Sequence, residues 1–87
     1  MAKQYFVTYA VKAYCNELYF RFLCFADDPA QIKDFIRIEN NVRRATYQPH
    51  MFRVKIYTKE PVYWGLRTAC KYDGIDLSDR GYRDDRE

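Results

Sequence analysis

Residues 4–26, QYFVTYAVKAYCNELYFRFLCFA, decide the fold of this chain. Alternate side chains along residues 4–14, and again along 18–26, point to opposite faces, and both runs are rich in aromatic and β-branched residues. A period of two with these residue types indicates β-strands. Only residues 15–17 separate the two runs. We therefore expect a β-hairpin at the start of the chain.

A helix is expected directly after this hairpin. Asp28 precedes Pro29, and aspartate before proline suits a helix start, because the carboxylate accepts hydrogen bonds from amides of the first turn. The apolar stripe of the helix comprises Ile32, Phe35 and Ile36. The pattern predicts a helix over residues 29–41, extending to residue 44 at most.

Two further elements are expected in the second half of the chain. Residues 51–58, MFRVKIYT, alternate again and predict a third strand. Its core-facing residues are Phe52, Val54 and Ile56, and its outward-facing residues are Met51, Arg53, Lys55 and Tyr57. A second helix is expected over residues 61–72, ended by Gly74 and weakened by Gly65 in its interior. Its apolar stripe comprises Val62, Leu66, Ala69 and Cys70.

These elements predict a single α+β domain over residues 1–75. The order β-β-α-β-α suggests a three-stranded antiparallel sheet, with the third strand beside the first and the first helix packed on one face. Residues 76–87 are charged and nearly free of aliphatic side chains, so we expect a disordered tail there.

The sheet face opposite the first helix is the main candidate for binding. If the strands pair as expected, its members are Lys12, Tyr14, Tyr19, Arg21, Phe25, Arg53, Lys55 and Tyr57. Tyrosine and arginine are favoured in protein interfaces, whereas cations beside flat rings also suit phosphates and unpaired bases. A third interpretation is that the second helix covers part of this face and its charges are merely solvated. Trp64 is a further partner-binding candidate if its ring is exposed.

The charge distribution and the aromatic content favour an interface. Residues 1–75 hold twelve bases and seven acids, which gives +5, whereas residues 76–87 hold five acids and three bases, which gives −2. A basic body suits nucleic acid or an acidic patch on a protein. Aromatic residues make up 18% of the chain. The nine tyrosines among them cannot all be buried, because each buried hydroxyl needs a partner.

Neither catalysis nor metal binding is expected. His50 is the only histidine and Ser78 the only serine, and no glycine-rich phosphate loop is present. Cys15, Cys24 and Cys70 lack the short spacings of zinc ligands. We expect them to be free thiols of a reducing cytoplasm, and we predict no cofactor.

The chain is expected to work in the cytoplasm without a membrane partner. Its start leads directly into a strand, so no signal peptide is predicted. Arg21 interrupts the longest apolar run, so no membrane span is predicted. An exposed edge strand at residues 18–26 could pair between copies, which makes a homodimer a further possibility.

The overall plan resembles small phage-encoded inhibitor proteins, including anti-CRISPRs and phage inhibitors of host enzymes. The resemblance rests on the hairpin at 4–26, the capped helix from Asp28, the return strand at 51–58 and the charged tail. It implies a stoichiometric inhibitor that docks on a larger host or phage protein complex and blocks a site. We therefore expect a non-catalytic protein-binding module, with a small single-stranded nucleic-acid-binding protein as the alternative.

Overall fold

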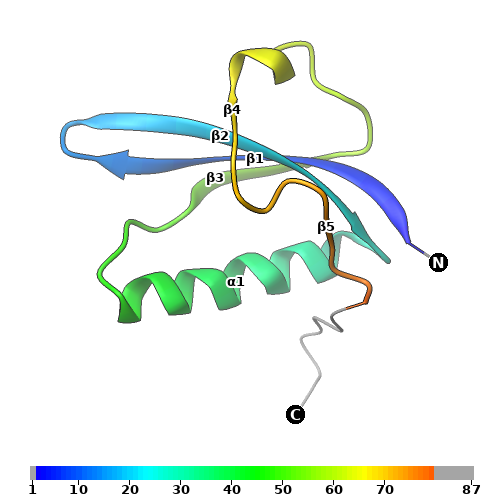
Figure 1. Ribbon diagram of the computed structural model, residues 1–87, viewed down its shortest axis with the longest axis horizontal. Helices are drawn as coiled ribbons and strands as arrows, with labels where there is room; N and C mark the ends of the chain where they lie inside the picture. Colours follow the sequence, from blue (N-terminus) through cyan, green and yellow to red (C-terminus); the bar gives the residue numbers. More distant parts are fainter. Residues whose placement is uncertain (1, 80–87) are drawn as a thin grey trace.

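The computed structural model describes residues 2–79 as a mixed sheet with one helix packed against one of its faces (Figure 1). The elements are β1 (Lys3–Ala13), β2 (Asn16–Ala26), α1 (Pro29–Ala45), β3 (Phe52–Tyr57), a short 3-10 turn η1 (Trp64–Leu66), β4 (Thr68–Ala69) and β5 (Ile75–Asp76). The strand order is β3-β1-β2-β4, and β5 also pairs with β2. The predicted α+β class is confirmed, as is the position of β3 beside β1. The predicted three-stranded antiparallel sheet is wrong, because β4 and β5 add to β2 in parallel and make a mixed sheet of five strands.

The predicted hairpin is confirmed. β1 and β2 pair in antiparallel register from Lys3 opposite Ala26 to Ala13 opposite Asn16. Tyr14 therefore belongs to the turn, where its φ is 58° and its side chain is fully exposed. The prediction that placed Tyr14 on a strand face is wrong, because the hairpin closes one residue earlier than the alternation suggested.

Helix α1 begins as its sequence predicts. The Asp28 carboxylate accepts a hydrogen bond from the Gln31 amide at 3.1 Å, and the Gln31 side-chain oxygen accepts one from the Asp27 amide at 2.7 Å. The first bond satisfies an amide of the first turn that a helix start leaves without a partner, and the second ties the residue before the cap to the helix. The predicted stripe of Ile32, Phe35 and Ile36 is buried. The helix extends one residue beyond the longest prediction, to Ala45.

β3 carries a bulge that changes the direction of its side chains. Two residue steps on β1 are matched by three on β3 between Lys55 and Phe52. Arg53 lies within this stretch, and its φ of 53° is in the left-handed region. As a result, Met51 joins the core and Phe52 lies opposite Ala10 on the other side of the sheet. The predicted directions of Met51 and Phe52 are wrong because strict alternation assumes an uninterrupted ladder.

The predicted second helix over residues 61–72 is also wrong. After β3, residues 58–67 cross the sheet face that lies opposite α1, and only η1 within them is helical (Figure 1). We call residues 58–67 the crossover. Gly65 lies inside η1, and a glycine in a helix interior opposes a longer helix. The extended path that follows instead gives the edge of β2 its hydrogen-bonding partners.

The C-terminal segment closes this edge of the sheet. β4 and β5 run parallel to β2, and the amides of Cys70, Gly74 and Leu77 donate to carbonyl groups of β2 at 3.1, 2.6 and 2.7 Å. The exposed edge that the homodimer hypothesis assumed at 18–26 is therefore largely occupied within the same chain. Residue 77 also lies beyond the predicted domain boundary at 75, and residues 80–87 of the predicted tail lie outside the described residues.

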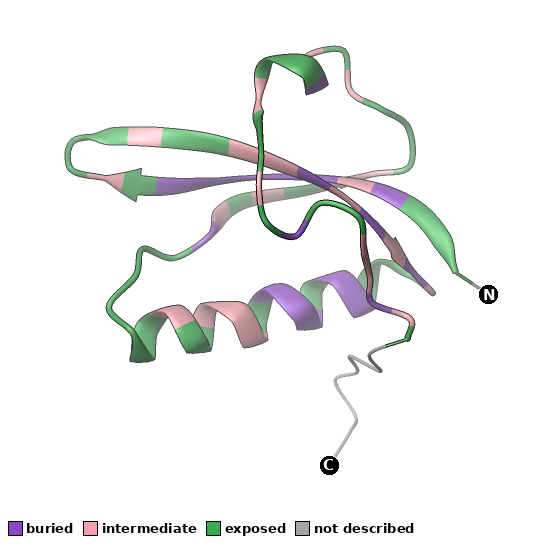
Figure 2. Cartoon of the chain, in the orientation of Figure 1, coloured by how far each residue is buried: buried purple, intermediate pink, exposed green. Residues whose placement is uncertain are grey.

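The core lies between α1 and the sheet. Figure 2 shows buried positions along the middle of β1 and in the first half of α1. The Tyr72 ring packs edge-on against Phe22 and Phe35. Its hydroxyl donates to Glu39 at 2.7 Å and accepts from Arg43 at 3.4 Å. These contacts fasten the C-terminal segment to α1 and leave the opposite sheet face to the crossover.

Candidate binding site

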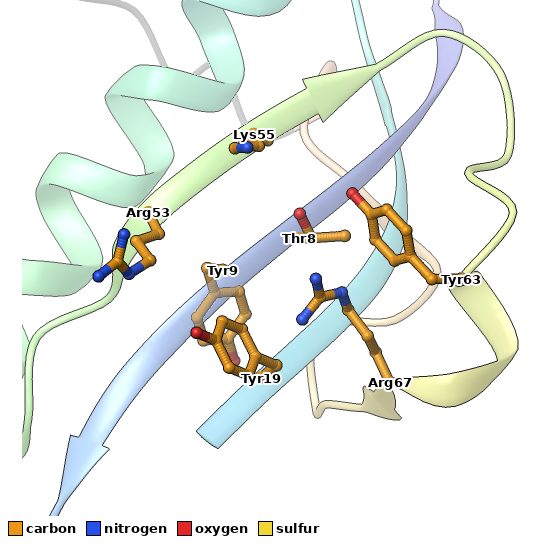
Figure 3. Close-up of a pocket in the computed structure, with 7 residues that line it drawn as sticks. All are labelled: Thr8, Tyr9, Tyr19, Arg53, Lys55, Tyr63 and Arg67. Carbon is orange, nitrogen blue, oxygen red and sulfur yellow. The ribbon is translucent and has the colours of Figure 1, made fainter. Parts of the chain in front are cut away.

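A hollow of about 250 Å³ lies on the sheet face opposite α1, beside the crossover (Figure 3). We call it the basic pocket. Its lining residues are Thr8, Tyr9, Tyr19, Arg53, Lys55, Tyr63 and Arg67. They come from β1, β2, β3 and the crossover. Three of the seven are cationic and none is acidic, so the pocket concentrates positive charge from β3 and the crossover.

Arg67 is positioned by two tyrosine rings. Its guanidinium carbon lies 4.6 Å from the centroid of the Tyr19 ring and 4.4 Å from that of the Tyr63 ring. Figure 3 shows the guanidinium between these rings, directed into the pocket. Both distances are within the range of cation–π attraction, which orients the charge without neutralising it. Arg67 therefore presents a fixed positive group.

Arg53 is held by an acidic residue outside the lining. Its Nε and one terminal nitrogen donate to the two Glu17 oxygens, both at 3.3 Å, and the Tyr19 hydroxyl donates to Glu17 at 2.6 Å. The hydrogen bond from Tyr19, followed by that from Arg53, lowers the pKa of Glu17. One of the three positive charges is thus paired. Lys55 and Arg67 have no ion-pair partner within residues 2–79.

The crossover is joined to β3 by a pair of phenols. The hydroxyl oxygens of Tyr57 and Tyr63 are 2.7 Å apart. The hydrogen bond to Tyr57 lowers the pKa of Tyr63, and Thr8 and Arg67 act in the same direction. The same bond raises the pKa of Tyr57. Either hydroxyl can be the donor of this bond. This bond fixes one wall of the basic pocket.

Trp64 fastens the other part of the crossover. Its side chain is only 8% exposed and packs edge-on against Phe6, with ring centroids 5.2 Å apart. The Arg21 guanidinium lies 5.0 Å from the Trp64 centroid, and Arg21 Nε donates to the Arg67 carbonyl at 3.0 Å. The condition on which Trp64 was a partner-binding candidate, an exposed ring, is therefore not met. Trp64 and Arg21 instead hold the crossover against the sheet.

The structure brings together part of the predicted set. Tyr19, Arg53 and Lys55 line the basic pocket, and Tyr57 contacts its wall through Tyr63. Lys12, which lies opposite Glu17, and Tyr14 at the hairpin turn are not among the lining residues. Thr8, Tyr9, Tyr63 and Arg67 also line the pocket and were missed from the predicted set. Tyr63 and Arg67 could not be placed there from the sequence, because the spacing of apolar residues over 61–72 predicted a second helix and not a crossover.

Reactive side chains do not gather around the pocket. Within residues 2–79, no group of three or more His, Cys, Asp or Glu side chains could hold a metal ion. The three cysteines are free, and burial raises the pKa of the Cys24 thiol to about 12, which makes it a weak nucleophile. In the part of the chain described here, no helix has both the length and the apolar character to cross a membrane.

Comparison with known proteins adds no relative. No protein-family model, curated protein or solved structure matches the chain. The resemblance to phage inhibitors therefore remains a prediction from the sequence.

Proposed function

We propose that this protein is a non-catalytic binding module that docks on an acidic surface of a larger protein through the face that bears the basic pocket. The observation that carries the proposal is the meeting of Arg53, Lys55 and Arg67 around one hollow, with no acidic residue in its lining. Cations gathered on one face speed up association with an oppositely charged partner and disfavour binding to positively charged proteins.

The surroundings of the pocket favour a protein over single-stranded nucleic acid. Nucleic acid of this kind is held by cations together with rings whose faces stack on bases. Here one face of Tyr19 and one face of Tyr63 are occupied by the Arg67 guanidinium, and both hydroxyls are hydrogen-bonded. What the site offers outward is mainly charge, which suits a carboxylate-rich protein surface.

A module of this kind would act by occupying a site on its partner. The face offers donors and positive charge but no nucleophile paired with a base among the pocket residues. Binding without turnover blocks whatever else uses the same surface, which agrees with the stoichiometric inhibitor that the overall plan resembles. The role of inhibitor is part of the proposal.

The experiment is affinity capture with two charge-reversed variants. Lys55→Glu changes an exposed residue of the basic pocket, whereas Lys33→Glu makes the same change at an exposed position of α1, away from the pocket. We expect one partner to be recovered in stoichiometric amount with the wild type and with Lys33→Glu. The affinity for the purified partner should fall by at least about tenfold with Lys55→Glu, because a new like charge would face the acidic surface.

Equal affinity of all three proteins for that partner would contradict the proposal. A labelled single-stranded oligonucleotide at low salt tests the alternative. Binding that weakens linearly with the logarithm of salt concentration, and that Lys55→Glu removes, would favour a nucleic-acid-binding protein instead.

A further inference from the structure

The basic pocket has a size and charge that narrow the group it accepts. Its volume of about 250 Å³ is below the roughly 300–1,000 Å³ typical of sites for drug-sized ligands. A nucleotide or a peptide segment is too large to enter it whole. A single compact group from a larger molecule fits this space.

The charge balance points to an anion with more than one negative charge. Three cations line the pocket, and the Glu17 carboxylate, which lies outside the lining, is bonded to Arg53. Lys55 and Arg67 are left as two uncompensated positive charges among the described residues. A carboxylate would balance only one of them. A phosphomonoester carries about −1.5 to −2 at pH 7 and three acceptor oxygens.

The two cationic donors, Arg67 and Lys55, also differ in their chemistry. The planar Arg67 guanidinium can donate two parallel hydrogen bonds to a phosphate. Lys55 adds a compact point charge from β3, on another side of the hollow (Figure 3). The Arg67 side chain is already held between Tyr19 and Tyr63, so little of its conformational freedom is lost when an anion binds.

We infer that the basic pocket binds a phosphomonoester carried by a phosphorylated side chain of the protein partner. This inference rests on the proposed function, because it takes the partner to be a protein that docks on this face. Arg67 and Lys55 bind the phosphate oxygens. Glu17 keeps Arg53 at the edge of the pocket and prevents the charge there from exceeding what one phosphate balances.

The test is an NMR titration of the ¹⁵N-labelled protein with inorganic phosphate, acetyl-phosphoserine amide, acetyl-serine amide and acetate. We expect both phosphates to produce saturable shifts in the amides of Thr8, Tyr63 and Arg67, and the other two compounds to produce none. Lys55→Gln should weaken phosphate binding by about tenfold, as expected for a hydrogen bond to a charged group. Lys33→Gln on α1 should leave it unchanged.

Four results would overturn the inference. They are the absence of a saturable shift, equal weakening by the two lysine variants, binding of acetate as tight as that of phosphate, and binding of inorganic phosphate but not of the phosphoserine compound. None of these results bears on capture of the partner. A partner whose affinity depends on Lys55 but survives phosphatase treatment unchanged would keep the proposed function and remove the phosphate.

Discussion

The hydroxyl oxygens of Tyr57 and Tyr63 lie 2.7 Å apart, and this contact joins the crossover to β3. The bond to Tyr57 is the largest cause of the lowered pKa of Tyr63. Tyr57→Phe should therefore raise the pKa of Tyr63 toward its ordinary value of 10.0. An NMR titration of the Tyr63 ring signals checks this. Tyr14→Phe, at the exposed turn, should leave the Tyr63 pKa unchanged. An unchanged Tyr63 pKa in Tyr57→Phe would show that the two phenols are not bonded.

Protonation of Glu17 at low pH should weaken its contacts with Tyr19 and Arg53 at the edge of the basic pocket. Its folded-state pKa lies below the ordinary value of 4.5, mainly because Tyr19 donates to it and then because Arg53 does. The stabilisation is therefore present above pH 4.5 and is lost as the pH falls through the folded-state pKa. A carboxyl NMR titration should show the lowered pKa in the wild type. Tyr19→Phe and Arg53→Gln should each raise it. A Glu17 pKa that neither substitution raises would show that these two groups do not hold the carboxylate.

Replacing Tyr14 by glycine should stabilise the folded protein. Its φ of 58° is a conformation that costs an ordinary residue roughly 1–2 kcal/mol and glycine almost nothing. Its side chain is fully exposed, so no burial is lost on removing it. Tyr14→Gly should raise the free energy of unfolding by about 1 kcal/mol in urea denaturation. Tyr14→Ala removes the ring but keeps the Cβ atom, so it should give no such gain. Equal gains from both variants would assign the effect to the ring.

Local signals in the sequence predict the first half of the fold well. The alternation over 4–26 and the cap at Asp28 depend on neighbouring residues only, and the structure confirms the hairpin and the start of α1. The bulge at Arg53 was not predictable in this way. A left-handed φ at an arginine is imposed by pairing with β1, and nothing in the sequence near residue 53 indicates it.

Only part of the candidate site was predictable, again because the local sequence does not determine long-range contacts. Tyr19, Arg53 and Lys55 follow from strand alternation, since all three belong to strands that the sequence predicts. Tyr63 and Arg67 lie in a crossover whose path is set by long-range contacts, such as that between Trp64 and Phe6. Residues 61–72 have enough helical spacing to suggest a helix, and the unpaired edge of β2 decides otherwise.

Leu77 is a further position where a long-range contact outweighs the local sequence. Its substitution gives the largest predicted change in the free energy of unfolding. It stands in a charged stretch that composition alone assigns to a tail, yet its side chain is fully buried and its amide bonds to the Phe25 carbonyl. Leu77→Ala should lower the free energy of unfolding by about 3 kcal/mol, because it removes buried methyl groups and leaves a cavity. Val62→Ala, at a fully exposed position, should change it by less than about 0.5 kcal/mol. Urea denaturation of the two variants measures the difference. If Leu77→Ala is as mild as Val62→Ala, the C-terminal segment does not contribute to the core, and the edge of β2 is open to another chain after all.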